Sequence, residues 1–315
     1  MKIVVTPRTF GKFDPGVYDL LASYGLEADV NDTGAKWPDE VFLEHARDCD
    51  GIIFGTEPID AKLLDACPRI RAVAKYGVGI DNVDADACRS RGVKLSRTVG
   101  ANAIAVADFA FGMAIDAARH ITRYDKSIRT GAWDIRTTPD VTGKTIGVIG
   151  LGAIGRLVAA RARGFSMQIW GYDPYWDEDY AEEAGVRYAE PDEICRNADF
   201  IMLHLPLTPQ TRGFIDERRI ALMKKTAVLI NCARGGIVDE DALYHALVHR
   251  QIYAAGLDVF VDEPKVDARW YGLDNVLLSP HAAAQTYDAT AAMASVSGTP
   301  KKRPIQRAAR ILSAL

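Results

Sequence analysis

Features that mark several other classes of protein are missing from this sequence. The 315 residues contain only five cysteines, with no C-x-x-C pair and no zinc-ligand spacing, so neither a metal site nor a disulfide framework is expected. No run of about 18 uninterrupted apolar residues is present, which argues against a membrane span. Asp and Glu (42) outnumber Lys and Arg (38), and this balance argues against a general binder of nucleic acid or anionic membranes.

Other absences concern compartment and architecture. The odd number of cysteines favours a reducing, cytoplasmic compartment. Residues 2–6 already have strand character, so we expect no signal peptide, and the chain has no internal repeat of fixed period. What is present is the composition of a globular protein, 48% hydrophobic and 25% charged, in a chain long enough for two domains.

Strand-like and helical stretches alternate along the first third of the chain. We predict strands at residues 2–6, 50–55, 71–76 and 93–96, and a helix at residues 14–24. This alternation is typical of a parallel sheet covered by helices. The segment KYGVGIDN, residues 75–82, has two glycines at a strand end, which suit either the approach of a ligand to the main chain or an ordinary turn.

Residues 102–130 form a long, mostly helical stretch whose first half is apolar nearly all round. Such a helix is buried, either between domains or between subunits, and the sequence leaves both open. An exposed connector is expected at residues 133–141. The basic C-terminal segment predicts a solvated closing helix rather than a binding arm. Its apolar face would comprise Ile305, Ala309, Leu312 and Leu315.

The alternation resumes in the second half of the chain. Strands are predicted at residues 145–149, 168–172, 200–205, 227–231, 254–259 and 276–278. The predicted fold class is therefore α/β, with a six-stranded, doubly wound parallel sheet of the dinucleotide-binding kind in this half. Ligands of such sheets bind at the carboxyl ends of the strands. The notable residues at these ends are Asp173, His204, Pro206, Cys232, Arg234, Asp258 and His281.

A G-x-G-x-x-G motif follows the predicted strand at residues 145–149, and an acid, Asp173, follows the predicted strand at residues 168–172. Gly150 permits a tight turn, Gly152 lets the main chain approach a pyrophosphate, and Gly155 lets the following helix pack on the strand. The N-terminus of that helix favours phosphate groups. Asp173 is placed to accept hydrogen bonds from ribose hydroxyls and would repel a 2′-phosphate, so the motif predicts NAD rather than NADP as cofactor.

Three polar residues at the same edge suit hydride transfer between a nicotinamide and a 2-keto acid. The planar guanidinium of Arg234 suits a substrate carboxylate and carbonyl. His281 is the residue type that most often supplies a proton near neutral pH. Glu263 can orient an imidazole and stabilise its protonated form. Each residue alone has an ordinary structural explanation, but the three together beside a dinucleotide motif favour a catalytic role.

These motifs resemble those of the D-isomer specific 2-hydroxyacid dehydrogenases, the family of D-3-phosphoglycerate dehydrogenase and glyoxylate/hydroxypyruvate reductase. The resemblance runs from about residue 73 to residue 281. It rests on KYGVGIDNVD, VGANAIAVAD, GKTIGVIGLGAIG, HLPLTPQTRGFID, NCARGGIVDEDAL, GLDVFVDEP and SPHAA. It implies two doubly wound domains, a flavodoxin-like substrate domain of residues 1–98 plus 285–315 and a Rossmann NAD-binding domain of residues 99–284. It also implies a homodimer formed through the cofactor domains.

The resemblance also implies roles for individual residues. Arg234 would bind and polarise the substrate, His281 would be the acid/base, and Glu263 would support His281. Asp173 would hold the adenosine ribose. Residues expected to contact the pyrophosphate through their main chain are Ala153 and Ile154, and those expected to line the rest of the cofactor site are His204, Pro206, Thr211, Cys232 and Asp258. Val78 and Gly79 would offer main-chain N–H groups to the substrate carboxylate.

The substrate side chain is less well defined by the sequence. Phosphoglycerate dehydrogenase-like activity is the leading expectation, because Arg8 at the end of the first strand is placed to reach a substrate phosphate. Glyoxylate or hydroxypyruvate reduction is the alternative, and an NAD-sensing binding protein without turnover is an alternative of another class. The family's closing helix is hard to recognise in residues 298–315, and we expect no C-terminal regulatory domain and hence no serine feedback through one.

Overall fold

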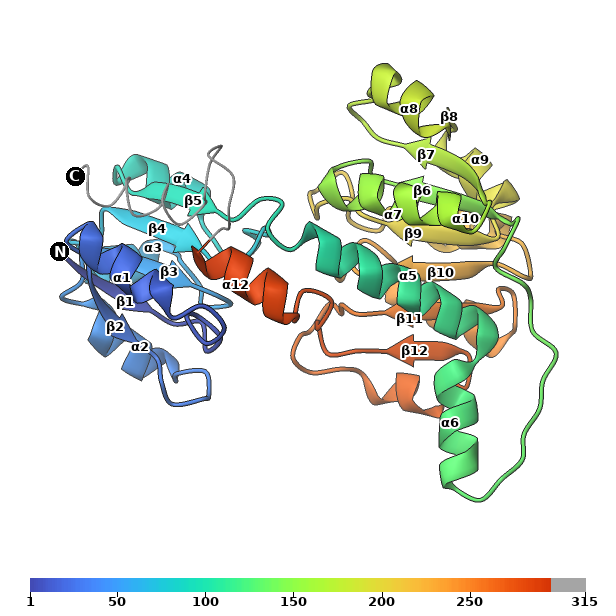
Figure 1. Ribbon diagram of the computed structural model, residues 1–315, viewed down its shortest axis with the longest axis horizontal. Coiled ribbons are helices and arrows are strands. Elements are labelled where there is room, and N and C mark those ends of the chain that lie inside the picture. The colour runs from blue at the N-terminus through green and yellow to red at the C-terminus, as the bar shows by residue number, and fades with distance from the viewer. Residues whose placement is uncertain (296–315) are drawn as a thin grey trace. The chain divides into compact units, whose positions relative to one another are not determined.

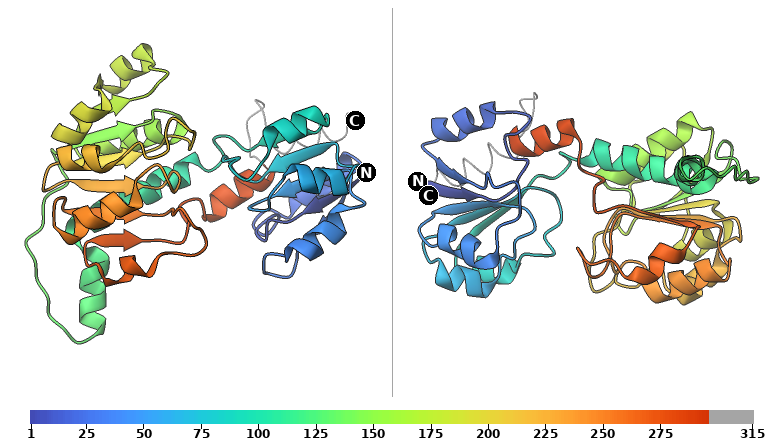
Figure 2. Two further views of the ribbon diagram at one scale, coloured as in Figure 1. Left: turned by 180° about the vertical axis from the view of Figure 1, so that it is seen from behind. Right: turned by 90° about the horizontal axis from the view of Figure 1, so that it is seen from below.

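The computed structural model describes residues 1–295, which form two compact α/β units (Figure 1). The first unit comprises Met1–Asn102 and residues 285–295, and the second comprises Ala103–Ala284. Each unit is a parallel sheet with helices on both faces, as the view from below shows most clearly (Figure 2). The predicted fold class is therefore confirmed.

The first unit is built on a five-stranded sheet within the described chain. Its strands are β1 Lys2–Val5, β2 Glu27–Val30, β3 Gly51–Phe54, β4 Ala72–Lys75 and β5 Lys94–Arg97, and its helices are α1 Gly16–Ser23, α2 Asp39–Ala46, α3 Ala61–Ala66, α4 Ala85–Ser90 and α12 Tyr287–Ser295. The order β2-β1-β3-β4-β5, with all pairs parallel, is the flavodoxin-like order. Strand β2 was not predicted, because its sequence EADV is polar and only partly buried.

Alternating side chains of β1 supply the two cores of this unit. Val4 packs with α2, α3 and α4 on one face, whereas Ile3 and Val5 pack with α1 on the other. Ala294 of α12 joins the second core, and the Tyr76 hydroxyl donates to the carbonyl of Thr290 at 2.8 Å. The last described helix therefore packs on the N-terminal sheet rather than on the unit that precedes it in sequence.

The second unit has a seven-stranded sheet within the described chain, one strand more than predicted. Its strands are β6 Thr145–Ile149, β7 Gln168–Tyr172, β8 Val186–Tyr188, β9 Phe200–Leu203, β10 Val228–Asn231, β11 Ala254–Leu257 and β12 Val276–Leu278. The order β12-β11-β10-β9-β6-β7-β8 is the Rossmann order extended by β12. The prediction missed β8, a three-residue edge strand with two exposed residues, because so short and polar a run has no hydrophobic pattern.

Helices cover both faces of this second sheet. They are α5 Ala103–Arg119, α6 Ile121–Arg129, α7 Ala153–Gly164, α8 Glu178–Ala184, α9 Pro191–Asn197, α10 Glu217–Leu222 and α11 Glu240–Val248, with a 3₁₀ helix η1 at Ala268–Gly272. The core on one face contains residues of α5, α7 and α8, and the core on the other contains residues of α9, α10 and α11. Every residue of β9, β10 and β11 is buried, as expected for central strands covered on both faces.

Aspartates define where several helices begin. Asp177, Asp216 and Asp239 each accept a hydrogen bond from a main-chain N–H of the first turn that follows. The same cap occurs at Asp60 and Asp84 in the first unit. Each cap satisfies a donor that the helix cannot pair internally, and such a cap is worth about 1 kcal/mol. These helices therefore start where the sequence provides an acid between a strand and an apolar stripe.

The long helical stretch predicted for residues 102–130 is interrupted at His120. This residue adopts the left-handed conformation, with φ 57° and ψ 34°, and separates α5 from α6. Helix α5 packs against α7, β10 and β11 of its own unit, which accounts for most of its apolar surface. The connector beyond α6 is exposed, as predicted, with Trp133 81% and Ile135 77% exposed.

The predicted closing helix, with Ile305, Ala309, Leu312 and Leu315, lies outside the described residues. None of the helices within residues 1–295 combines the length and apolar character that crossing a membrane requires.

Candidate active site

The loop between β6 and α7 has the geometry that a dinucleotide requires. Gly150 has φ +100°, and an added Cβ would lie 2.7 Å from the carbonyl carbon of His204. At Gly155 a Cβ would lie 1.9 Å from the carbonyl oxygen of Gly150, so the first turn of α7 can pack here only with glycine. By contrast, no described atom lies within 4 Å of a Cβ built on Gly152. The main chain at the start of α7, which includes Ala153 and Ile154, is thus open to a phosphate group.

Asp173 follows β7 and is fixed on both sides of its carboxylate. One oxygen accepts the N–H of Leu151 at 2.7 Å, and the other accepts the N–H of Tyr175 at 2.8 Å. The first of these bonds ties the acid to the glycine-rich loop. Asp173 therefore lies beside that loop with a defined orientation, as a ribose-binding acid must.

The loop after β9 brings His204, Pro206 and Thr211 to the same edge of the sheet. The main-chain N–H of His204 donates to Ile149 at 2.8 Å. Both ring nitrogens are buried and have no partner among the described residues, and burial lowers the pKa of this imidazole to about 4. The ring is therefore neutral at pH 7. The hydroxyl of Thr211, itself buried, donates to the carbonyl of Pro206 at 2.5 Å and fixes the loop.

The loop after β10 presents Cys232 and Arg234. Cys232 is 8% exposed, its sulfur lies 3.6 Å from that of Met113, and burial raises the pKa of its thiol. The buried Asn231 donates to the carbonyl of Arg234 at 2.9 Å and accepts from the N–H of Ala233 at 3.0 Å. This amide shapes the turn that carries the guanidinium. Asn231 is not among the site residues predicted from the sequence, although an Asn at a turn often binds the main chain two residues on.

The loop that carries Arg234 packs against the loop that carries Glu263. A Cβ on Gly235 would lie 2.1 Å from the carbonyl carbon of Phe260, so only glycine allows this approach. Phe260 in turn donates its main-chain N–H to Glu263 at 2.9 Å. The two loops are therefore in direct contact at the carboxyl edge of the sheet.

Glu263 and His281 form a hydrogen-bonded pair. The Oε2 atom of Glu263 lies 2.7 Å from Nδ1 of His281. Burial alone would raise the pKa of Glu263, but the bonds from His281 and from Phe260, together with the charge of Arg234, lower it below its usual range. The carboxylate is then ionised and can only accept, so Nδ1 carries the shared proton. The imidazole is oriented by one nitrogen and leaves Nε2 available for a substrate.

Asp258 holds the loop that carries His281. It is 0% exposed, and its carboxylate accepts from the Ser279 hydroxyl at 2.6 Å and from the N–H groups of Ala282 at 2.8 Å and Ala283 at 3.0 Å. His281 itself has φ 52°, a left-handed conformation that is uncommon outside glycine. The buried acid therefore contributes to a strained turn that positions the imidazole.

The second unit thus brings most of the predicted residues to one edge of its sheet. Val78 and Gly79 belong to the first unit, where they follow β4. Their loop is anchored by Thr98, which is 5% exposed and accepts the N–H of Gly77 at 2.9 Å. Within residues 1–295 no group of three or more His, Cys, Asp or Glu side chains is arranged to hold a metal ion.

The carboxyl edge of the second unit's sheet combines an open glycine-rich turn, a fixed acid beside it, an oriented imidazole and a neighbouring guanidinium. The first two features fit a dinucleotide, because the turn leaves room for phosphates and the acid can accept ribose hydroxyls. The last two fit proton transfer next to an anionic substrate. The arrangement is suited to a cofactor-dependent reaction at a carbonyl or hydroxyl group.

Comparison with known proteins points to the same chemistry. The family model described as D-isomer specific 2-hydroxyacid dehydrogenase, NAD binding domain, matches residues 111–283. The glyoxylate reductase of Korarchaeum cryptofilum is 40% identical over 274 residues, which cover 82% of each chain. The D-3-phosphoglycerate dehydrogenase of Methanocaldococcus jannaschii is 42% identical over 262 residues, which cover 82% of this chain and 50% of that protein.

The chain also resembles a solved structure that contains a bound cofactor. The D-lactate dehydrogenase of Aquifex aeolicus, in complex with NAD and lactic acid, is 27% identical to this chain and superimposes with a TM-score of 0.77. The match covers 92% of this chain and 90% of that one. The likeness therefore extends over nearly the whole chain.

Proposed function

Because the chain belongs to the D-isomer specific 2-hydroxyacid dehydrogenase family, we propose that it reduces a small 2-keto acid of the glyoxylate type to the 2-hydroxy acid. It is an NAD-dependent oxidoreductase that acts on a CH–OH group. The observation that carries the proposal is the bond between Glu263 and His281, because it fixes a proton-bearing imidazole beside the loop of Arg234.

His281 is the acid/base of the proposed reaction. With Nδ1 bound to Glu263, its Nε2 gives a proton to the substrate oxygen during reduction and takes it back during oxidation. Glu263 is a positioning residue, which keeps the ring oriented and balances the charge that the imidazole carries when both nitrogens are protonated. NADH, when bound, supplies the hydride.

Arg234 holds the substrate in this proposal. A guanidinium offers a planar pair of donors that matches a carboxylate, and its charge polarises the adjacent carbonyl. In the first unit, the main-chain N–H groups of Val78 and Gly79 are the donors that this proposal assigns to a substrate carboxylate. On the cofactor, Asp173 takes the ribose hydroxyls and the main chain at Ala153 and Ile154 takes the pyrophosphate. The loops of His204, Pro206, Thr211, Cys232 and Asp258 line the remainder.

The relatives favour glyoxylate over 3-phosphoglycerate as the substrate type. The match to the K. cryptofilum glyoxylate reductase extends over 82% of that protein, whereas the match to the M. jannaschii phosphoglycerate dehydrogenase extends over half of that one. Phosphoglycerate dehydrogenase activity is the second candidate, and the 42% identity favours it. Arg8 is exposed, and its guanidinium donates to the carbonyl of Gly34 at 3.4 Å. This arrangement leaves Arg8 at the surface, as the phosphate-binding hypothesis requires.

The proposed functional form is a homodimer. Large apolar side chains are exposed along α6 and the connector that follows: Ile121 54%, Ile128 56%, Trp133 81% and Ile135 77%. So many apolar side chains in one short segment are unusual for a surface that stays in water. A second copy of the chain is the partner that the family resemblance implies, and this segment is the surface that we assign to it.

The test is NADH oxidation, followed at 340 nm, with glyoxylate, hydroxypyruvate, 3-phosphohydroxypyruvate and pyruvate. We expect the highest kcat/KM with glyoxylate or hydroxypyruvate. The His281→Asn variant is the control, because Asn tolerates the left-handed conformation of this position but donates no catalytic proton. Preference for 3-phosphohydroxypyruvate would establish the second candidate. NADH binding without reduction of any keto acid would indicate an NAD-sensing protein and refute the enzymatic proposal.

A further inference from the structure

A polar cavity lies in the second unit, at the edge of the sheet opposite to the candidate active site. It has a volume of about 210 Å³. Its lining residues are His120, Arg136, Thr137, Lys225, Arg250, Ile252, Tyr253 and Asp274. Lys225 precedes β10, Arg250 and Tyr253 precede β11, and Asp274 precedes β12, so this cavity is at the amino ends of parallel strands. The candidate active-site residues follow the carboxyl ends of the same strands. A four-residue strand such as β10 or β11 spans about 13 Å, so the cavity and the candidate active site lie at opposite ends of the sheet.

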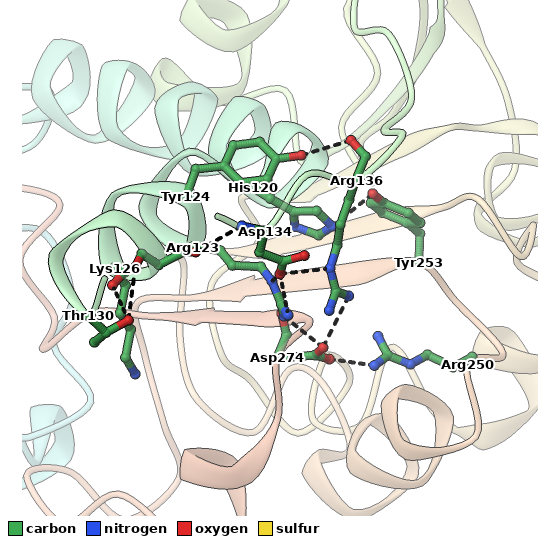
Figure 3. Close-up of polar contacts among 11 residues, drawn as sticks. His120, Arg123, Tyr124, Lys126, Thr130, Asp134, Arg136, Arg250, Tyr253 and Asp274 are labelled. Carbon is green, nitrogen blue, oxygen red and sulfur yellow. Dashed lines mark hydrogen bonds and ion pairs between the residues drawn. The ribbon is translucent and has the colours of Figure 1, made fainter. Parts of the chain in front are cut away.

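The cavity wall is built from groups that are fixed by the fold. The ring of His120 stacks on that of Tyr253, with centroids 5.4 Å apart, and its Nε2 lies 2.9 Å from the Tyr253 hydroxyl. Tyr124 of α6 donates its hydroxyl to the carbonyl of Arg136 at 2.9 Å (Figure 3). The next residues are tied to α5, because Arg119 donates to the Thr138 hydroxyl at 3.0 Å. The segment that bears Arg136 is thus fixed to both helices.

Positive charge converges on this cavity. Figure 3 shows the guanidinium groups of Arg123, Arg136 and Arg250 directed at Asp274, with Arg123 also bound to Asp134. Burial opposes ionisation of Asp274, but the bonds from Arg250 and Arg123 lower its pKa, and the bonds from Arg123 and Arg136 lower that of Asp134. Both acids are therefore ionised at neutral pH.

The charges of this cluster do not balance. Arg123, Arg136, Arg250 and Lys225 are cationic, whereas Asp134 and Asp274 are the acids bound to the three arginines. Burial, with the charges of Arg123 and Arg136, lowers the pKa of His120, so this ring is neutral at pH 7. The cluster carries an excess of two positive charges. Among residues 1–295 the Lys225 ammonium has no hydrogen bond or ion pair, although it lines the cavity.

We propose that this cavity, lined by Arg136, Lys225 and Arg250, binds a small phosphate-type dianion. A dianion neutralises the surplus charge of the cluster. The guanidinium groups provide paired donors, Lys225 provides a point charge, and Thr137 provides a hydroxyl, which together match the oxygens of a phosphate group. The volume equals roughly seven water molecules of about 30 Å³ each, which is enough for a phosphate group with a small organic substituent.

This site is separate from the proposed active site and does not depend on the reaction assigned there. The bound group is therefore neither the cofactor nor the keto acid. The shared chemistry is the phosphate dianion, and its source is either free phosphate or the monoester of a small metabolite.

The test is isothermal titration calorimetry of the full chain at pH 7.5 and constant ionic strength, with saturating NADH to occupy the cofactor site. The probes are inorganic phosphate and glycerol 3-phosphate. We expect one saturable site per chain, and tighter binding of whichever probe represents the natural source. The Lys225→Ala and Arg250→Ala variants should each bind about tenfold or more weakly, as expected for loss of a charge-assisted contact.

Two controls separate a built site from general attraction. Arg129→Ala removes an arginine that, like Arg250, is exposed and bound to one acid, and Lys126→Ala removes an exposed lysine of α6. Neither should change the affinity. Within residues 1–295, Lys225→Ala removes no hydrogen bond or ion pair, so it reports on binding even if Arg250→Ala is destabilised. Absence of saturable binding, or equal affinity in the Lys225→Ala variant and the unmodified chain, would overturn the proposal.

Discussion

The carbonyl of Asp258 accepts the main-chain N–H of His281 at 2.8 Å, while the Asp258 carboxylate accepts the N–H groups of Ala282 and Ala283. One buried residue thus holds the turn that carries the proposed acid/base. The orientation of the His281 ring then comes from Glu263. Backbone position and ring orientation are therefore set by two different acids, and the two effects can be separated by substitution.

The substitution Glu263→Gln should lower kcat by roughly 10²–10⁴-fold, because an amide orients the ring less well and supplies no charge for the imidazolium. The KM for the keto acid should change far less, since Glu263 is assigned no contact with the substrate. Steady-state kinetics with NADH fluorescence titration will measure both effects. Partial recovery in Glu263→Asp would support a positioning role, and equal losses in kcat and NADH affinity would contradict it.

The substitution Arg234→Lys should reduce kcat/KM for the keto acid by about 10²–10³-fold, as for loss of one preorganised charge-stabilising group. A lysine keeps the charge but not the paired donors. The loop itself should survive, because Asn231 binds the main chain of this residue rather than its side chain. NADH affinity is the internal control. An unchanged kcat/KM would exclude Arg234 from substrate binding.

The substitution Asp173→Asn should lower the preference for NADH over NADPH by about tenfold or more, because the negative charge that repels a 2′-phosphate is removed. The amide oxygen can still accept the N–H of Leu151 or Tyr175, so the loop should remain folded. The ratio of kcat/KM values for the two cofactors is the measurement. The exposed Asp179→Asn variant of α8 should leave that ratio unchanged.

The buried ring of His204 should make the folded state less stable in acid. Its pKa falls from 6.5 in the unfolded chain to about 4 in the fold, so below pH 6.5 the unfolded state binds a proton that the folded state refuses. Stability is therefore lost as the pH falls from 6.5 towards 4. Relative to His204→Leu, the unmodified chain should lose on the order of 3 kcal/mol across this window.

Urea unfolding at pH 7.5 and pH 4.5 measures this difference, because acid effects shared by both chains cancel. The exposed His249→Leu variant is the control and should show no such difference. A parallel response of His204→Leu and the unmodified chain to pH would show that the ring of His204 is hydrated in solution.

Substitutions in the exposed apolar connector should weaken the proposed dimer. Trp133→Ser and Ile135→Ser should each raise the dimer dissociation constant by about tenfold or more, because buried aromatic and aliphatic anchors dominate such interfaces. Sedimentation velocity at several concentrations will show the change. Tyr175 is 90% exposed on another loop of the same unit, so Tyr175→Ser is a matched control. A monomeric unmodified chain would refute the dimer.

The sequence by itself identified the parts of this protein whose chemistry is local. The G-x-G-x-x-G turn, the acid at the end of the next strand and the Arg, Glu and His residues all follow strands that a run of apolar residues reveals. Buried parallel strands give a clear signal because both faces are covered and nearly every side chain is apolar. The strands β2 and β8 escaped prediction because edge strands with polar residues lack that signal.

Only the tertiary structure decided the features that join distant segments. It broke the predicted helix at His120, whose left-handed conformation accompanies a contact with Tyr253. It showed that Asn231 and Asp258 hold the loops that carry Arg234 and His281, and it gathered Arg136, Lys225 and Arg250 from three separate segments around one cavity. These relationships depend on which loops meet at a sheet edge, and strand order, not the local pattern of residues, determines that.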